Sequence, residues 1–200
     1  MKKILFIITL FFSCSLFSQS NKIISGPMFS YIDARSTQLW ILLEPDAKQV
    51  EVNVNNYDNT KFLNYEYKVK NPHKFKNYIP VTIPIEALRP NTEYVVNISI
   101  DGVKLDKDFD LYTARPHLDD IHFLIGGGLF ELNEKTDDIF QKMKKMNSDF
   151  MIWMGNNISS DLSVDNIDFR NLVDQYVETR SNNALNEFLQ STPQIANWDE

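Results

Sequence analysis

The sequence predicts a β-sandwich followed by an incomplete α/β unit. Residues 22–114 contain short apolar segments separated by turn residues, and several short strands at this spacing are typical of a sandwich. Residues 119–200 instead alternate short apolar segments with longer segments of helical period, which is typical of parallel strands joined by helices. We therefore expect two units, joined by a short linker around residues 114–117.

Six strands are expected in the first unit. Residues 88–94, with Leu88, Pro90 and Tyr94, are typical of the corner at which a strand tyrosine bonds back to the preceding loop in fibronectin type III and immunoglobulin-like domains. This segment favours a fibronectin III-like sandwich, although Tyr94 would also fit an ordinary half-buried strand position. The expected strands are Gln38–Leu43, Val50–Val54, Phe62–Val69, Tyr78–Ile85, Tyr94–Ile100 and Phe109–Thr113.

Three parallel strands and two helices are expected in the second unit. The central strand, Met151–Met154, is apolar on both faces and stops at Gly155, as in a buried parallel sheet. Ligands bind at the carboxyl ends of such strands, so we expect any chemistry around Asn156 and Asn157. The other segments are the strands Ile121–Gly126 and Gln194–Trp198 and the helices Glu134–Asn147 and Asn166–Leu189.

Residues 1–20 are expected to be a secretory signal peptide of bacterial type. Lys2 and Lys3 precede the apolar segment Ile4–Phe12, which is too short to span a bilayer, and Ser18 is a plausible cleavage position. Acylation of Cys14 is a weaker alternative. We therefore expect a secreted or periplasmic protein without a transmembrane segment.

The charge distribution argues against nucleic acid as a partner. The chain has 20 basic and 27 acidic residues, and the acidic excess lies in residues 116–200, which hold 15 acidic and 6 basic side chains. No basic stripe is present to neutralise phosphates. An acidic half would suit a cation site, although acidic solvated helices are the commoner cause.

The glycine run Gly126-Gly127-Gly128 is expected to form a close backbone turn. A dinucleotide fingerprint would need a third glycine where Glu131 stands, and no Gly-Lys-Ser/Thr sequence follows to make a P-loop. Phosphate binding by the amides before the helix at Glu134 is a minor alternative.

Four segments in order carry a resemblance to a known family. They are Phe123–Gly128, Asp149–Ile158, Tyr176–Arg180 and Thr192–Glu200. Together they resemble the N-terminal part of the PhoD-like alkaline phosphatase/phosphodiesterase family, secreted metallophosphatases with a β-sandwich ahead of a two-metal α/β domain. The resemblance implies metal-dependent phosphoester hydrolysis with calcium, iron or similar ions. It also implies that residues 119–200 are the front part of a truncated metallophosphatase-like domain.

The departures from the family pattern weaken the expected metal site. Asn156 stands where the family has a metal-bridging aspartate, and Gly128 where it has a cysteine. Of the matching metal positions only Asn156 and Asp199 offer side-chain oxygens, and a hydrolytic site needs three or more ligands for each cation. We therefore expect this 200-residue chain to be inactive alone.

The resemblance also implies substrate-binding positions. These are Asn157, Tyr176 and Arg180. Structural roles are the alternative, with Tyr176 packed on a helix face, Arg180 solvated and the asparagines forming a turn. In a different class of function, the chain would be a secreted binding or structural module that uses its β-sandwich. Because three strands bury little core, a partner chain that completes the sheet is also expected.

Overall fold

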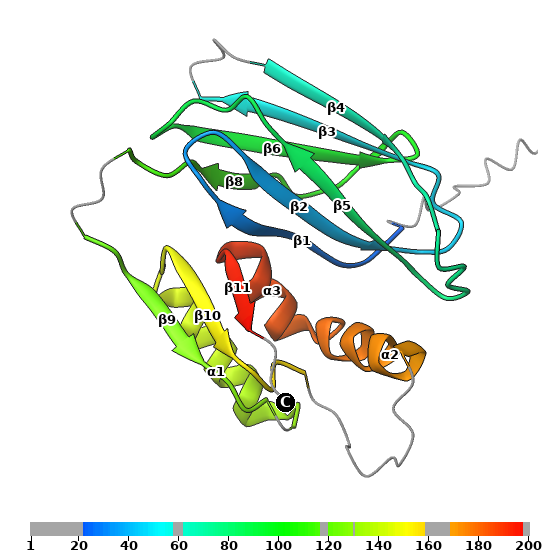
Figure 1. Cartoon of the computed structure of the whole chain (residues 1–200), viewed down its shortest axis with the longest axis vertical. Helices are drawn as coiled ribbons and strands as arrows, with labels where there is room; N and C mark the ends of the chain where they lie inside the picture. The colour runs from blue at the N-terminus through cyan, green and yellow to red at the C-terminus, as the bar shows by residue number, and fades with distance from the viewer. Residues whose placement is uncertain (1–21, 58–61, 117–119, 130, 159–168, 198–200) are drawn as a thin grey trace, which may run out of the picture.

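The structure is a computed structural model that describes residues 22–57, 62–116, 120–129, 131–158 and 169–197. Within these ranges the chain forms two antiparallel sheets, followed by a parallel sheet with three helices (Figure 1). No helix among the described residues is long and apolar enough to cross a membrane. The predicted signal peptide lies outside the described residues.

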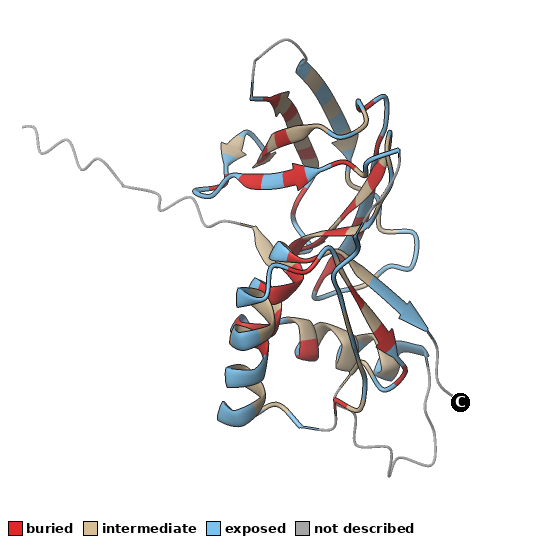
Figure 2. Cartoon of the chain, turned by 90° about the vertical axis from the view of Figure 1, so that its left-hand side faces the viewer, coloured by how far each residue is buried: buried red, intermediate tan, exposed pale blue. Residues whose placement is uncertain are grey.

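The first half is a β-sandwich, as the sequence predicts. One sheet has the strand order β1–β2–β5 and the other β4–β3–β6–β7, with β8 also paired to β6. Alternate residues, such as Leu39 and Ile41 of β2 and Val52 of β3, are buried between the sheets (Figure 2). The strands are β1 (Ile23–Ile32), β2 (Thr37–Leu43), β3 (Gln49–Asn56), β4 (Phe62–Lys68), β5 (Ile79–Ile85), β6 (Glu93–Ile100), β7 (Val103–Lys104) and β8 (Phe109–Tyr112).

The predicted tyrosine corner is confirmed. Tyr94 opens β6 and is fully buried. Its hydroxyl oxygen accepts a hydrogen bond of 2.8 Å from the backbone amide of Arg89. The tyrosine thereby fixes the loop before β6 to the strand that follows it.

Strand β1 is not predicted by the sequence. It contains Gly26-Pro27, and proline within a run argues against a strand because it cannot donate to the ladder. The structure accommodates this pair where the pairing of β1 with β2 shifts register. Gly26 has a φ of +86°, and a Cβ there would lie 2.9 Å from the carbonyl oxygen of Trp40. A glycine is therefore needed at this shift in register.

The second half contains a parallel sheet with the strand order β11–β10–β9. Its parallel pairing confirms the sequence prediction. Helices α1 and α3 cover one face, where Met151 and Trp153 of β10 pack with Phe140 of α1 and Phe188 of α3. The elements are β9 (Phe123–Gly126), α1 (Glu134–Lys145), β10 (Phe150–Met154), α2 (Phe169–Arg180), α3 (Asn183–Ser191) and β11 (Gln194–Asn197).

The other face of the parallel sheet is apolar, and several of its described side chains are exposed. The register places Phe123 beside Phe150, and Ile152 between Ile125 and Ile195. The Ile125 side chain is 62% exposed. We call this surface the open face; its residues are Phe123, Ile125, Phe150, Ile152, Met154 and Ile195.

The prediction of one helix over Asn166–Leu189 is wrong. Within the described part of that range the chain forms α2 and α3, and the break lies at Asn182. The Asn182 side chain accepts a hydrogen bond of 2.9 Å from the backbone amide of Leu185, so it caps α3. Asparagine is a favoured N-cap because its side-chain oxygen satisfies a free amide of the first turn. Helical period alone did not reveal this cap.

Helices α2 and α3 contact the outer face of the β1–β2–β5 sheet. The Ser25 hydroxyl donates to the backbone oxygen of Arg180 at 2.7 Å, and the Gly26 amide donates to the Asn186 side chain at 2.8 Å. The Gln190 side chain donates to the Gly26 carbonyl at 2.7 Å. These bonds join residues about 160 positions apart in the sequence.

Candidate functional site

The carboxyl ends of the three parallel strands meet at one edge of the sheet. Trp153 of β10 pairs with Gly126 of β9 on one side and with Ala196 of β11 on the other. The turns that follow β9 and β10 therefore lie next to each other. This is the edge at which the sequence places the expected chemistry.

The turns after β9 and β10 are in close contact. The Leu129 amide donates a hydrogen bond of 2.8 Å to the Asn156 carbonyl. A Cβ on Gly127 would lie 2.9 Å from the Gly155 carbonyl oxygen, so only glycine allows the two backbones to approach this closely. Gly127 therefore allows a close contact between the two turns, which the sequence prediction of a close backbone turn did not include.

The structure brings together three of the five predicted site residues. The Tyr176 hydroxyl donates to the Asn157 side-chain oxygen at 3.1 Å, and the Arg180 guanidinium lies 4.7 Å from the centre of the Tyr176 ring. Asn156 is exposed and has a φ of +45°, which asparagine tolerates better than most residues. Asp199 lies outside the described residues.

The described side chains at this edge do not by themselves fit a metal centre. Among the described residues no group of three or more His, Cys, Asp or Glu side chains could hold a metal ion. Gly128 has no side chain, and Asn156 offers one neutral amide oxygen, which cannot offset the charge of two cations. Asn157 already uses its side-chain oxygen to accept from Tyr176.

Arg180 is not solvated. Its Nη1 is buried and has no hydrogen-bond partner among the described residues. Burial lowers the pKa of the guanidinium, and the neighbouring Tyr176 acts in the opposite direction. Arginine nevertheless stays protonated in proteins. The structure therefore holds a partly buried cation, with Nη1 fully buried, at the last residue of α2.

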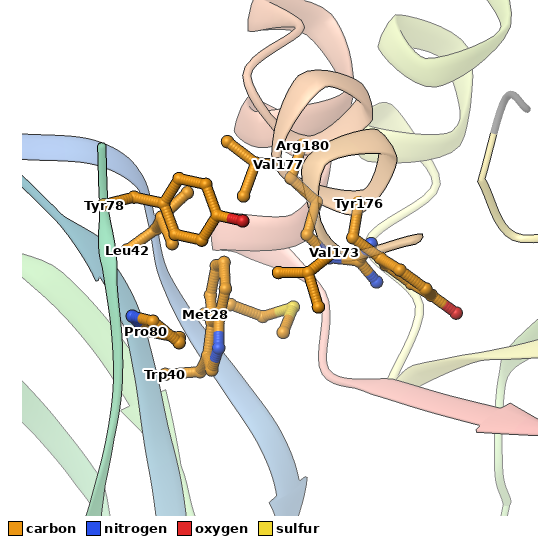
Figure 3. A pocket seen from close by; sticks show the side chains of 9 residues that line it. All are labelled: Met28, Trp40, Leu42, Tyr78, Pro80, Val173, Tyr176, Val177 and Arg180. Atoms are coloured by element: carbon orange, nitrogen blue, oxygen red, sulfur yellow. The ribbon is translucent and has the colours of Figure 1, made fainter. Parts of the chain in front are cut away.

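A cavity of about 280 Å³ lies between α2 and the outer face of the sandwich (Figure 3). Tyr78 closes one side, and its hydroxyl donates to the Asp174 carboxylate at 2.6 Å. Burial, followed by this hydrogen bond, raises the pKa of Tyr78. Nine residues line the cavity: Met28, Trp40, Leu42, Tyr78, Pro80, Val173, Tyr176, Val177 and Arg180.

The sequence analysis did not predict this cavity. The sequence feature that could have indicated it is the set of apolar residues Trp40, Leu42 and Pro80. These side chains point away from the sandwich core, at positions where an exposed sheet would carry polar side chains. Such residues indicate that another element covers the sheet. They could not identify α2 as that element.

No protein-family model and no curated protein matches this chain. Among solved structures, that of PhoD matches with a TM-score of 0.69 and 16% sequence identity. The fold is similar to that of PhoD. The match covers 91% of this chain and 40% of the PhoD chain, so this chain spans well under half of the length of its structural relative.

Two further structures match about half of this chain. The sensor domain of the anti-sigma factor RsgI4 from Pseudobacteroides cellulosolvens matches with a TM-score of 0.36 and 13% identity, over 48% of this chain and 91% of that one. The fibronectin type III domain from human KIAA0970 protein matches with a TM-score of 0.35 and 16% identity, over 50% of this chain and 77% of that one.

Proposed function

We propose that this chain is a secreted protein related to the PhoD-like alkaline phosphatases, and that residues 1–200 do not hydrolyse phosphoesters by themselves. The PhoD-like fold supports the first part. The family reaction is metal-dependent hydrolysis of a phosphoester, with calcium, iron or similar ions. A shortage of metal ligands among the described residues at the strand ends supports the second part.

The substitution at Asn156 carries this proposal. Asn156 follows β10 at the edge where the three strands end, and the resemblance places a metal-bridging aspartate there. An amide has no negative charge and cannot bridge two cations. Asp199 is the other position that the resemblance assigns to a metal, and two side chains are too few for a hydrolytic centre.

We propose that Asn157 and Tyr176 make the substrate contacts that the resemblance implies. Their hydrogen bond of 3.1 Å holds both side chains beside the turn that follows β10. Arg180 instead lines the cavity between α2 and the sandwich, so we do not propose that it contacts the phosphoester.

Neither the natural chain nor Asn156→Asp is expected to hydrolyse phosphoesters. A single added carboxylate leaves the cations under-coordinated, so no metal-bound water acquires a pKa near neutrality. The assay measures release of p-nitrophenol from p-nitrophenyl phosphate and from bis(p-nitrophenyl) phosphate, with Ca²⁺, Fe³⁺, Mn²⁺ and Zn²⁺ supplied one at a time.

Asn147→Asp provides the matched control for this experiment. Asn147 is also an exposed asparagine with a positive φ, of 47°, but it follows α1 rather than a strand of the site. Both variants should show the same absence of turnover. Metal-dependent turnover by the natural chain, abolished by Asp199→Ala, would show that Asn156 and Asp199 do form a working centre.

Export is expected from the N-terminal sequence. Lys2, Lys3 and the apolar segment Ile4–Phe12 support a cleaved signal peptide. When the full chain is produced in a bacterium, mass spectrometry of the extracytoplasmic fraction should find a new N-terminus near Ser18. Recovery of only cytoplasmic chains that retain Met1 would contradict export.

A binding module is the second candidate function. The cavity between α2 and the sandwich favours it, because Trp40, Leu42 and Pro80 of the sandwich form one wall. This function needs no metal and would persist in a chain that is catalytically inactive.

A further inference from the structure

Arg180 places a positive charge in an otherwise apolar cavity. Arg180 lines the space between α2 and the β1–β2–β5 sheet, together with Trp40, Met28 and Val177, and its guanidinium lies beside Tyr176 (Figure 3). A buried ion is strongly destabilising unless it is paired and hydrogen-bonded. A partner for this cation is therefore expected.

The described residues meet this requirement only in part. The Tyr176 ring lies 4.7 Å from the guanidinium carbon, and a cation over a ring face gains some stabilisation. Nη1 has no hydrogen-bond partner among the described residues. The Asp174 carboxylate accepts a hydrogen bond from the hydroxyl of Tyr78, which also lines the cavity. One face of the guanidinium is thus compensated, while the missing hydrogen bond at Nη1 leaves part of its charge unbalanced.

We propose that this cavity binds a small carboxylate with an aromatic or medium-length aliphatic body. The carboxylate would pair with the Arg180 guanidinium, and the body would lie against Trp40, Met28 and Leu42. The cavity of about 280 Å³ is roughly twice the size of one of about 150 Å³ that holds benzene. A ring with a short acidic chain fits that volume.

A monoanion fits this cavity better than a phosphate dianion. A phosphate needs several donors to offset its charge when it leaves water, whereas the lining offers a single guanidinium among apolar and aromatic side chains. The ligand is therefore not the phosphoester of the proposed reaction. The inference is independent of that reaction and of any metal.

The first test uses the unmodified chain and three probes that each carry a phenyl ring and differ mainly in their polar group. These are 3-phenylpropionate, the uncharged 3-phenylpropan-1-ol and phenyl phosphate, each titrated calorimetrically into the mature chain. Because a charged hydrogen bond is worth more than a neutral contact, the carboxylate should bind about tenfold more tightly than the alcohol or more. It should also bind more tightly than phenyl phosphate. The Met28 methyl resonance should shift as the carboxylate binds.

Arg180→Met tests the role of the charge, and Arg35→Met is its matched control. Arg35 is an exposed arginine in the turn between β1 and β2, away from the lining residues. Affinity for 3-phenylpropionate should fall to that of the alcohol in Arg180→Met and stay unchanged in Arg35→Met. If Arg180→Met does not fold, Val177→Phe fills the cavity while keeping the arginine, and it should weaken binding of both probes.

Several results would overturn the inference. They are equal affinity for the carboxylate and the alcohol, tightest binding of phenyl phosphate, no binding of any probe at millimolar concentration, and carboxylate binding that persists in a folded Arg180→Met chain. None of these results depends on whether the chain hydrolyses phosphoesters.

Discussion

Replacing Phe188 with alanine is expected to lower the free energy of unfolding of the α/β half by about 3–5 kcal/mol. Phe188 of α3 is completely buried and stacks on Phe140 of α1, with 6.3 Å between the ring centres. Removing the ring loses its transfer energy and leaves a cavity in a small core. Urea denaturation followed by fluorescence measures the loss, since Trp153 lies in the same hydrophobic cluster.

Phe62→Ala is the control for this prediction. Phe62 of β4 is 61% exposed, and substitutions at exposed positions usually change stability by about 0.5 kcal/mol or less. The core of the sandwich is a separate cluster of buried residues. If residues 22–114 and 119–200 are separate units, Phe188→Ala should leave amide exchange protected around Tyr94. Similar losses from both alanine variants would show that Phe188 is not a core residue.

The open face is expected to make the chain bind a hydrophobic dye and self-associate. Four of its residues, among them Ile125 and Ile195, are exposed large apolar side chains, and contiguous apolar patches of this kind promote association. The sequence predicts a partner chain that completes this sheet. The double variant Ile125→Thr with Ile195→Thr should lower the dye fluorescence several-fold and shift the chain toward monomer in sedimentation. Threonine keeps the β-branched shape that strands favour.

Ile139→Thr is the matched control for the open face. Ile139 is an exposed isoleucine on α1, so its substitution replaces an exposed apolar side chain without touching the sheet. It should leave dye binding and sedimentation unchanged. An equal response from the helix variant and the strand variants would mean that the association does not arise at the open face.

Six of the eight described sandwich strands, all but β1 and β7, could be predicted from the sequence, most clearly where their residues alternate. In β3, Val50, Val52 and Val54 are buried and their neighbours are not, and this period of two specifies both the strand and its inner face. The tyrosine corner at Tyr94 was predictable because its bond is local, to an amide five positions earlier. Patterns among residues that lie close together in the sequence were therefore sufficient to predict these strands and the tyrosine corner.

The features that were not predicted depend on residues far apart in the sequence. Strand β1 is broken by Gly26-Pro27, and its place in the sheet depends on pairing with β2 and bonds to α3. Arg180 is the last residue of α2, whose sequence suggests that this arginine is exposed. It is partly buried because α2 packs against sandwich residues that lie about 100 or more positions earlier in the sequence. The position of Arg180 in its helix does not reveal that this helix packs against the sandwich.

The contact of Gly26 with α3 also affects an edge of the sandwich. Strand β1 is the last strand of its sheet, where backbone groups are free to pair with a strand of another chain. Asn186 and Gln190 lie four positions apart on one side of α3, and they supply the acceptor and the donor that a neighbouring strand would supply. At Gly26 a helix therefore takes the place of a strand, and this point of the edge is closed to strand addition.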